Sequence, residues 1–312
     1  MIRHFLRDDD LAPAEQAEVL ELAVRLRHNR FGEQPLSGPR AVAVLFDKPT
    51  LRTQVSFSTG IAQLGGYPLV VDSRLAQIGT RESIADTARV LGRQVAAVVW
   101  RTYDQSRIEE MAQYAGVPVV NALTDQFHPC QLLADLMTVR QHCGGTAGVT
   151  LAYVGDGANN MAHSYLLAGA TAGMHIRIGC PDGYRPDEAV VAKAVARAEA
   201  TGGSVTVVDD PAEAVRDAKA VATDTWVSMG QEDEKAEREK PFLRYAVTAE
   251  LLGHAADEVG VLHCLPAYRG KEITADVLDG PRSLVWAQAE NRLHAQKALL
   301  VWLLRQVEGG RR

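Results

Sequence analysis

The chain lacks several features that would assign it to a special class of protein. Its four cysteines form neither a CxxC pair nor a zinc-binding pattern. No apolar run approaches the roughly 18 residues of a membrane span. The start of the chain lacks the apolar core of a signal peptide. We therefore expect a reduced, cytoplasmic globular protein with no membrane partner.

An excess of basic residues is also missing. The chain has 33 Lys and Arg against 39 Asp and Glu, which gives a formal net charge of −6. Because a nucleic-acid backbone demands a basic surface, this balance predicts no nucleic-acid partner. A small anionic ligand stays compatible with it, since a few arginines in one pocket are enough to bind one.

Strand-like apolar runs alternate with helical patterns along the whole chain. This alternation predicts an α/β fold with two domains, each a mainly parallel sheet flanked by helices. The length of 312 residues fits two domains of about 150 residues. The expected strands cover residues 41–46, 67–72, 96–101, 117–122, 149–155, 175–180, 204–208, 220–225 and 259–265.

A turn-rich segment, residues 143–148, predicts the boundary between the domains. We expect one domain over 1–146 and another over 147–312, joined by a helix over about 131–142. A last helix over about 284–306 has apolar residues on two sides. This pattern predicts that the helix packs back on the first domain.

Polar motifs follow strands in both halves of the chain. Residues 128–131 read His-Pro-Cys-Gln after one apolar run, and residues 263–266 read His-Cys-Leu-Pro after another. Open α/β sheets build their binding sites at the carboxyl ends of such strands. One motif in each half predicts an active site in a cleft between the domains.

The segment Thr50-Leu51-Arg52-Thr53-Gln54 follows the first expected strand, and a helix is expected to begin within it. The N-terminus of a helix offers free N–H groups and a positive dipole end to an anion. Arg52 adds a planar fork that suits phosphate oxygens. The alternative is an ordinary helix cap beside a surface arginine.

Two further arginines and a histidine are candidates for the same site. Arg101 ends a strand at the edge of the sheet, and Arg292 becomes a third cationic contact if the last helix borders the cleft. The following proline keeps His128 out of helical geometry, where it can donate to a carbonyl with Gln131 nearby. The alternative is that these residues are surface charges and a loop histidine.

The second half offers polar groups suited to an amino acid. Residues 155–160 resemble the start of a dinucleotide fingerprint, but Asn160 takes the place of its third glycine. A nicotinamide-dependent dehydrogenase therefore remains a weak alternative, while two adjacent amides suit a carboxylate or an amine. Asp224, after another strand, could bind an ammonium group with help from Ser228, or it could cap a helix.

Together these motifs resemble those of the aspartate/ornithine carbamoyltransferase family, over essentially the whole chain. Residues 128–131, 224–230 and 263–266 carry the resemblance, and the last two are typical of its ornithine-specific members. The family's phosphate loop reads Ser-Thr-Arg-Thr-Arg, so Leu51 and Gln54 depart from it. This departure keeps open an acylated-ornithine acceptor, because such relatives have a Leu-Arg-Thr loop, or a non-catalytic binding relative.

The resemblance implies a role for individual residues. Those implied for carbamoyl phosphate are Thr50, Leu51, Arg52, Thr53, Gln77, Arg101, His128, Gln131, Leu265 and Arg292. Those implied for ornithine are Asn160, Asp224, Ser228, Met229 and Cys264. The catalytic residues among them are Arg52, Thr53, Arg101, His128, Cys264 and Arg292. Gln77 is implied to reach into a neighbouring subunit's site, which implies a homotrimer or a multiple of trimers.

The resemblance also implies the chemistry. The δ-amine of L-ornithine attacks the carbonyl carbon of carbamoyl phosphate directly, giving L-citrulline and phosphate, a reaction typical of arginine biosynthesis. No metal and no organic cofactor is implied. Direct transfer needs no covalent intermediate, so Cys264 is expected to position the amine rather than attack as a nucleophile. The Leu265–Pro266 bond is expected to be cis.

Overall fold

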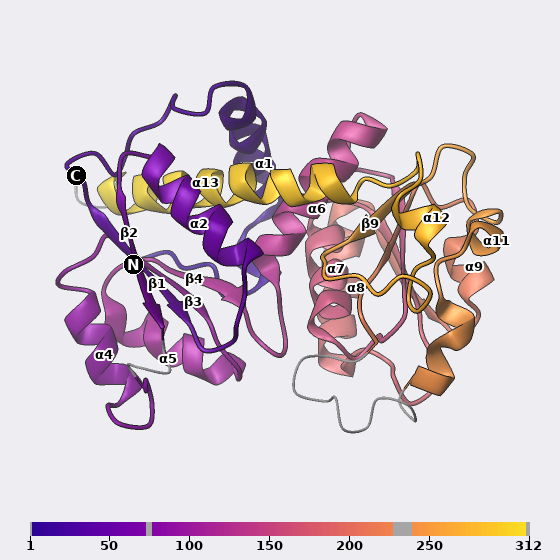
Figure 1. The fold of residues 1–312 in the computed structure, drawn as a ribbon, viewed down its shortest axis with the longest axis horizontal. Coiled ribbons are helices and arrows are strands. Elements are labelled where there is room, and N and C mark those ends of the chain that lie inside the picture. Colours follow the sequence, from indigo (N-terminus) through magenta and orange to yellow (C-terminus); the bar gives the residue numbers. More distant parts are fainter. Residues whose placement is uncertain (1, 73–76, 227–238, 310–312) are drawn as a thin grey trace. The chain divides into compact units, whose positions relative to one another are not determined.

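The computed structural model describes residues 2–72, 77–226 and 239–309 (Figure 1). The chain forms two compact units. The first unit is Met1–Met137 together with Glu290–Arg312, and the second unit is Thr138–Ala289. The division falls inside two helices, α6 (Pro129–Cys143) and α13 (Val285–Gly309). The domain limits expected at residues 146 and 147 stay a prediction.

The first unit is built on a four-stranded parallel sheet with the order β2-β1-β3-β4. Its strands are β1 (Ala41–Phe46), β2 (Tyr67–Asp72), β3 (Ala97–Arg101) and β4 (Val119–Leu123). β1 and β3 are buried along nearly their whole length, as expected for parallel strands that are covered on both faces. All four predicted strands are confirmed, with ends shifted by at most two residues.

Helices cover both faces of this sheet (Figure 1). On one face Leu45 and Trp100, which are register neighbours, pack in a core cluster with residues of α4 (Ile84–Leu91) and α5 (Gln105–Ala115). α2 (Arg52–Gln63) and α13 cover the other face. The remaining elements of this unit are η1 (Asp8–Asp10), α1 (Pro13–His28) and the first part of α6.

The second unit is built on a five-stranded parallel sheet with the order β7-β6-β5-β8-β9. Its strands are β5 (Thr150–Val154), β6 (His175–Gly179), β7 (Ser204–Val208), β8 (Ala220–Thr223) and β9 (Gly260–His263). The five strands predicted in this half are therefore present, and the fold class is the predicted one.

A core cluster on one face of this second sheet includes Val154, Val221 and Val261. It packs against the short helices α9 (Pro211–Val215), α11 (Ala249–Leu252) and α12 (Ala275–Leu278). The opposite face is covered by α7 (Asn160–Thr171) and α8 (Glu188–Thr201) (Figure 1). A 3-10 helix, η3 (Lys240–Tyr245), completes the described part of this unit.

The helix predicted over about 131–142 begins earlier than expected, at Pro129. Proline suits the first position of a helix, because its missing N–H would have no partner there and its φ is already helical. None of the helices in the described ranges combines the length and the apolar character that crossing a membrane requires.

Each sheet has a point where the chain changes the direction in which it adds strands. β1 lies between β2 and β3, and β5 lies between β6 and β8. Crevices open at the carboxyl ends of strands at such switch points, and ligands bind there. The segments that follow β1, β3, β5 and β8 are therefore the places to look for functional side chains.

Candidate active site

The loop between β1 and α2 has the predicted form of an anion site at a helix N-terminus. α2 begins at Arg52, and the Thr53 amide in its first turn donates to Thr50 Oγ1 at 3.4 Å. Thr53 is fully buried, whereas the Leu51 side chain is 73% exposed. The Leu51 side chain offers no polar group, but the backbone amides of this turn can still attract an anion.

Three guanidinium groups of the first unit lie close to one buried histidine. His128, which precedes α6, is buried, and so are Arg101 at the end of β3 and Arg292 in α13. Burial is the largest cause that holds the pKa of His128 well below its ordinary value, and the positive charges of Arg292, Arg101 and Arg52 add to it. Arg52, Arg101, His128 and Arg292, which the sequence analysis assigned to one site, are thus neighbours in the first unit.

Thr53 and Arg292 come from distant parts of the sequence and meet directly. Arg292 Nη2 donates to Thr53 Oγ1 at 2.8 Å. Because the hydroxyl oxygen accepts from the guanidinium, its own hydrogen can point to another acceptor. The pair thus combines a fixed positive charge with an oriented hydroxyl donor.

Gln131 sits in the first turn of α6 and is buried. Its Nε2 donates to Asp135 Oδ1 at 2.8 Å, which fixes the orientation of the amide. Among the residues that the structure describes, its Oε1 is buried without a hydrogen-bond partner. A buried acceptor of this kind calls for a donor, and a ligand N–H could supply it.

Gln77 lies just after residues 73–76, which the structure does not describe, in a turn of the first unit. It is exposed, with a φ of 49°, and its carbonyl accepts from the amides of Thr80 and Arg81. Positive φ is uncommon for a residue other than glycine. Its predicted place in a neighbouring subunit's site stays a prediction.

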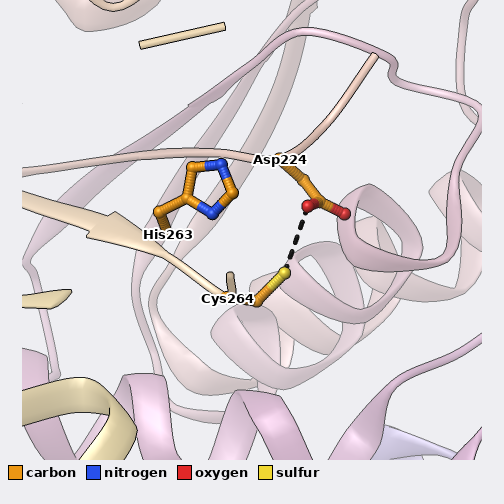
Figure 2. A group of neighbouring side chains, drawn as sticks. All are labelled: Asp224, His263 and Cys264. Atoms are coloured by element: carbon orange, nitrogen blue, oxygen red, sulfur yellow. Dashed lines mark hydrogen bonds between the residues drawn. The ribbon is translucent and has the colours of Figure 1, made fainter. Parts of the chain in front are cut away.

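In the second unit, the ends of the adjacent strands β8 and β9 bring Asp224 and Cys264 together (Figure 2). Cys264 Sγ donates to Asp224 Oδ1 at 3.2 Å. Burial is the largest cause that raises the pKa of Asp224, and the hydrogen bond from Cys264 works against it. The carboxylate is therefore costly to keep unpaired, which suits a site that receives a cation.

His263 and Glu272 brace the turn that carries Cys264. The amide of Leu265 donates to His263 Nδ1 at 2.9 Å, so the other ring nitrogen, Nε2, carries the hydrogen and donates to Glu272 Oε1 at 3.2 Å. Leu265 has a φ of 59°, and the Leu265–Pro266 bond is cis, as predicted. Sequence reasoning missed Glu272, because no local motif relates it to residues 263–266.

Asp224, His263 and Cys264 could together hold a metal ion, since their ligand atoms lie within 4.8 Å of one another (Figure 2). Both nitrogens of His263 are, however, already engaged with Leu265 and Glu272. An ion would have to displace one of these hydrogen bonds. Hydrogen bonding therefore accounts for the arrangement on its own.

Asn160 is the first residue of α7 and is partly buried. Its neighbour Asn159 caps that helix by accepting from the Ala162 amide at 2.9 Å, and donates to the Tyr153 hydroxyl at 2.8 Å. Asn159 therefore caps the helix, and Asn160 follows it as the first helical residue. The other residues predicted for ornithine, Ser228 and Met229, lie outside the described residues.

Comparison with known proteins assigns the chain to a family. Residues 3–141 match the model of the carbamoyl-P binding domain of aspartate/ornithine carbamoyltransferases, and residues 147–303 match that of the Asp/Orn binding domain. The chain belongs to the aspartate/ornithine carbamoyltransferase family. Arg52, Arg101 and His128 thus fall in the part that matches the carbamoyl-P binding model, and Arg292 and Cys264 fall in the other.

Several relatives of this family are similar over nearly their whole length. The ornithine carbamoyltransferase of Clavibacter michiganensis subsp. michiganensis is 64% identical over 306 residues, covering 98% of this chain and 100% of the relative. That of Mycobacterium ulcerans is 60% identical over 304 residues, covering 97% and 99%. The family predicted from the sequence motifs is confirmed.

Solved structures of the family agree with the fold. The ornithine carbamoyltransferase from Pyrococcus furiosus has a TM-score of 0.92 at 45% identity, covering 96% of both chains. The anabolic ornithine carbamoyltransferase from Campylobacter jejuni has a TM-score of 0.92 at 34% identity, covering 98% of this chain and 100% of the other. Family membership removes the main support for the dehydrogenase alternative, which rested on residues 155–160 alone.

Proposed function

We propose that the protein is an ornithine carbamoyltransferase, which converts carbamoyl phosphate and L-ornithine into L-citrulline and phosphate. The observation that carries the proposal is the gathering of Arg52, Arg101 and Arg292 about the buried His128. This group suits a small phosphorylated carbonyl compound, because it combines three cations with a neutral imidazole. Relatives named for this activity, at 58% identity and above, support the choice of substrates.

In this proposal the first unit binds carbamoyl phosphate. The N-terminus of α2, with Thr50, Arg52 and Thr53, holds the phosphate, and the amide of Leu51 contributes through its N–H. Arg101 spans the phosphate and the carbonyl oxygen. The buried Oε1 of Gln131 accepts from the carbamoyl N–H, which supplies the donor that this atom lacks.

The second unit binds ornithine in this proposal. Asp224 pairs with the α-ammonium group, and Asn160 contacts the α-carboxylate. Ser228 and Met229 complete the site, as the resemblance implies. Cys264 lies beside the δ-nitrogen, and the Leu265 carbonyl faces the carbamoyl group. The bracing of residues 263–266 by Glu272 keeps these last two groups in a fixed position.

The reaction begins when the δ-amine, in its neutral form, attacks the carbonyl carbon. An amine of this type has a pKa of about 10.4 in water, and the arginines of the first unit lower that pKa on binding. The new C–N bond forms as the carbonyl oxygen gains negative charge, which Arg101, Thr53 and His128 stabilise by hydrogen bonds. The C–O bond to phosphate then breaks, and the departing phosphate takes the proton from the nitrogen.

Arg292 and Cys264 have supporting parts in this mechanism. Arg292 holds the Thr53 hydroxyl at 2.8 Å and turns its hydrogen toward the oxyanion. Cys264 donates to Asp224, and its thiol positions the amine rather than forming a bond to carbon. No step requires a metal ion or an organic cofactor.

Assembly, setting and pathway are further parts of the proposal. Gln77 is exposed in its turn, which suits a contact with a neighbouring subunit's site. We propose a homotrimer, or a multiple of trimers, in the cytoplasm, acting in arginine biosynthesis. Light scattering on the purified chain measures the mass directly. A monomer that retains full activity would overturn the shared site.

The test of function is citrulline formation from carbamoyl phosphate with four acceptors: L-ornithine, N-acetylornithine, N-succinylornithine and putrescine. We expect turnover with ornithine and at most traces with the others. Preference for an acylated acceptor would show that the departures at Leu51 and Gln54 report specificity. No turnover with any acceptor would favour a non-catalytic binding relative.

A further inference from the structure

Arg107, in the first turn of α5, contacts three segments that are far apart in the sequence. Its Nε donates to Thr102 Oγ1 at 2.9 Å, and its Nη2 donates to the Ile78 carbonyl at 2.8 Å. The same Nη2 lies 3.5 Å from Asp47 Oδ2. A single planar guanidinium thus ties together the loop after β1, the end of β3 and the turn at residue 78.

These contacts are well shielded from water. The Asp47 side chain is 8% exposed and that of Arg107 is 24% exposed. Thr102 is fully buried, and its hydroxyl donates to Asp47 Oδ2 at 2.5 Å while it accepts from Arg107. A buried carboxylate with two donors of this kind is well ordered, and removing one partner leaves the others unsatisfied.

The contacts of Arg107 lie on either side of Arg101. Arg107 packs over the Trp100 ring, with 5.2 Å from Cζ to the ring centroid, and donates to Thr102. Arg107 thus contacts the residues directly before and after Arg101, on the face of the sheet that α5 covers.

The loop that leads to α2 is held by the same group. The Asp47 amide donates to the Arg101 carbonyl at 2.9 Å, and the Asp47 carboxylate accepts from Thr102. Asp47 lies a few residues before Thr50, which accepts a hydrogen bond from the first turn of α2. The position of the helix N-terminus relative to Arg101 is thus set through Asp47.

The turn at residue 78 is fitted to the guanidinium. A Cβ on Gly79 would lie 2.9 Å from Arg107 Nη1, and the φ of +80° at this residue also favours glycine. The space that glycine leaves open lets Arg107 approach the Ile78 carbonyl. The turn at residues 78 and 79 is therefore shaped to accept the Arg107 guanidinium.

We propose that Arg107 is a positioning residue for the carbamoyl-phosphate site, because its contacts with Trp100, Thr102 and Asp47 fix Arg101 and the loop before α2. It does not touch the substrate, and its effect passes through Thr102 and Asp47. The inference rests on the proposed function only for the identity of the anion.

The test compares Arg107→Met with a matched control, Arg89→Met. Arg89 also forms an ion pair, with Asp86 at 2.9 Å, and packs over a ring, that of Tyr114 at 4.6 Å, but it lies on α4. The measurements are KM and kcat for both substrates and the Kd of inorganic phosphate by calorimetry. Thermal unfolding is followed for each variant.

We expect Arg107→Met to raise the KM for carbamoyl phosphate and the Kd of phosphate about tenfold or more, because small displacements of binding groups are costly. The KM for ornithine changes by at most about twofold, and Arg89→Met changes none of these constants. Arg107→Lys restores only part of the effect, since an ammonium cannot span the same partners. Methylguanidinium added to Arg107→Ala restores phosphate binding.

A lower melting temperature with an unchanged carbamoyl-phosphate KM and phosphate Kd would overturn the proposal and leave Arg107 a stabilising residue only. If Arg107→Met does not fold, the same measurements are made on Thr102→Val, which removes the connecting hydroxyl at nearly constant volume. If the wild-type chain forms no citrulline, the proposed function fails. In that case the Kd of phosphate for Arg107→Met and Arg89→Met still tests whether Arg107 positions the anion site.

Discussion

Burial and three guanidinium groups all lower the pKa of His128, because each disfavours the charged imidazolium. A histidine with a depressed pKa stays neutral until the pH falls well below the ordinary value of about 6.5. A neutral imidazole can donate one N–H to an oxygen that gains charge, without giving up a proton. His128 is therefore suited to stabilising an oxyanion rather than to acid–base catalysis.

The pH dependence of the reaction tests this reading of His128. We expect kcat/KM for carbamoyl phosphate to show no inflection near about pH 6.5, because His128 is already neutral there. His128→Gln should lower kcat by about 100-fold. His175→Gln is the control, since this partly exposed histidine bonds Ser204 in the other unit. An inflection near that pH that vanishes in His128→Gln would contradict the account.

The pH dependence of ornithine binding tests the role of Asp224. Burial raises its pKa, so it takes up a proton at a higher pH than an ordinary aspartate. The KM for ornithine should therefore rise as the pH falls toward that pKa, while the KM for carbamoyl phosphate stays constant. Asp224→Asn should show a high ornithine KM without this acid dependence. Steady-state kinetics across the acid range decide the matter, and a normal ornithine KM in Asp224→Asn would refute the assignment.

Substitution of Cys264 distinguishes a positioning role of its thiol from covalent catalysis. Its thiol donates to Asp224 at 3.2 Å, and a serine hydroxyl can make the same bond. We expect Cys264→Ser to keep turnover within about tenfold of the wild type, because only one hydrogen bond changes. Complete loss of turnover with intact ornithine binding would instead indicate a covalent role.

At the scale of elements, α13 buries several polar side chains along its length. Lys297 is fully buried, and its Nζ donates to the Arg30 carbonyl at 2.5 Å and to Gln63 Oε1 at 2.9 Å. Burial, followed by the charge of Arg30, lowers its pKa to about 8. Lys297 is therefore still charged at neutral pH, and burying that charge costs stability.

This lysine should make stability depend on pH. Its pKa is about 8 in the folded chain and about 10.4 in the unfolded chain. The unfolded chain therefore binds more protons between these values, so the free energy of unfolding rises with pH through this range. We expect Lys297→Met to flatten that rise in urea unfolding. The partly exposed Lys271, replaced in the same way, is the control, and an unchanged slope in Lys297→Met would contradict the prediction.

The turn between β5 and α7 is sterically fixed at Gly157. A Cβ there would lie 2.7 Å from the Tyr184 carbonyl oxygen and 2.8 Å from Cys180 Sγ. Gly157→Ala should therefore destabilise the chain by about 1–3 kcal/mol, measured by denaturant unfolding. Gly145→Ala is the control, since nothing lies within 4 Å of its Cβ. Equal stability of the two variants would show that the turn adjusts freely.

The elements differ in how far the sequence could predict them. β1 and β2 begin and end where predicted, because each coincides with a short apolar run. The start of α6 was placed two residues late because Pro129 was used only to keep His128 out of helical geometry, although proline also suits the first position of a helix. The partners Glu272 and Arg107 were missed, because their contacts join segments that no local pattern relates.

On the scale of the whole molecule, each sheet presents side chains of the proposed site at its switch point. Arg52 and Arg101 follow the neighbouring strands β1 and β3, and Asp224 follows β8 beside β5. The sequence predicted these positions, because strand ends can be read from apolar runs. It could not predict that Arg292, distant in sequence, bonds Thr53, since this depends on how α13 packs in the first unit.

The central claim is that the groups around His128 and Asp224 serve one transfer reaction. The most direct measurement is the amount of citrulline formed for each phosphate released, with carbamoyl phosphate and L-ornithine supplied together and separately. The account predicts one citrulline for each phosphate, and phosphate release that depends on ornithine. Phosphate release without ornithine, or without citrulline, would contradict it.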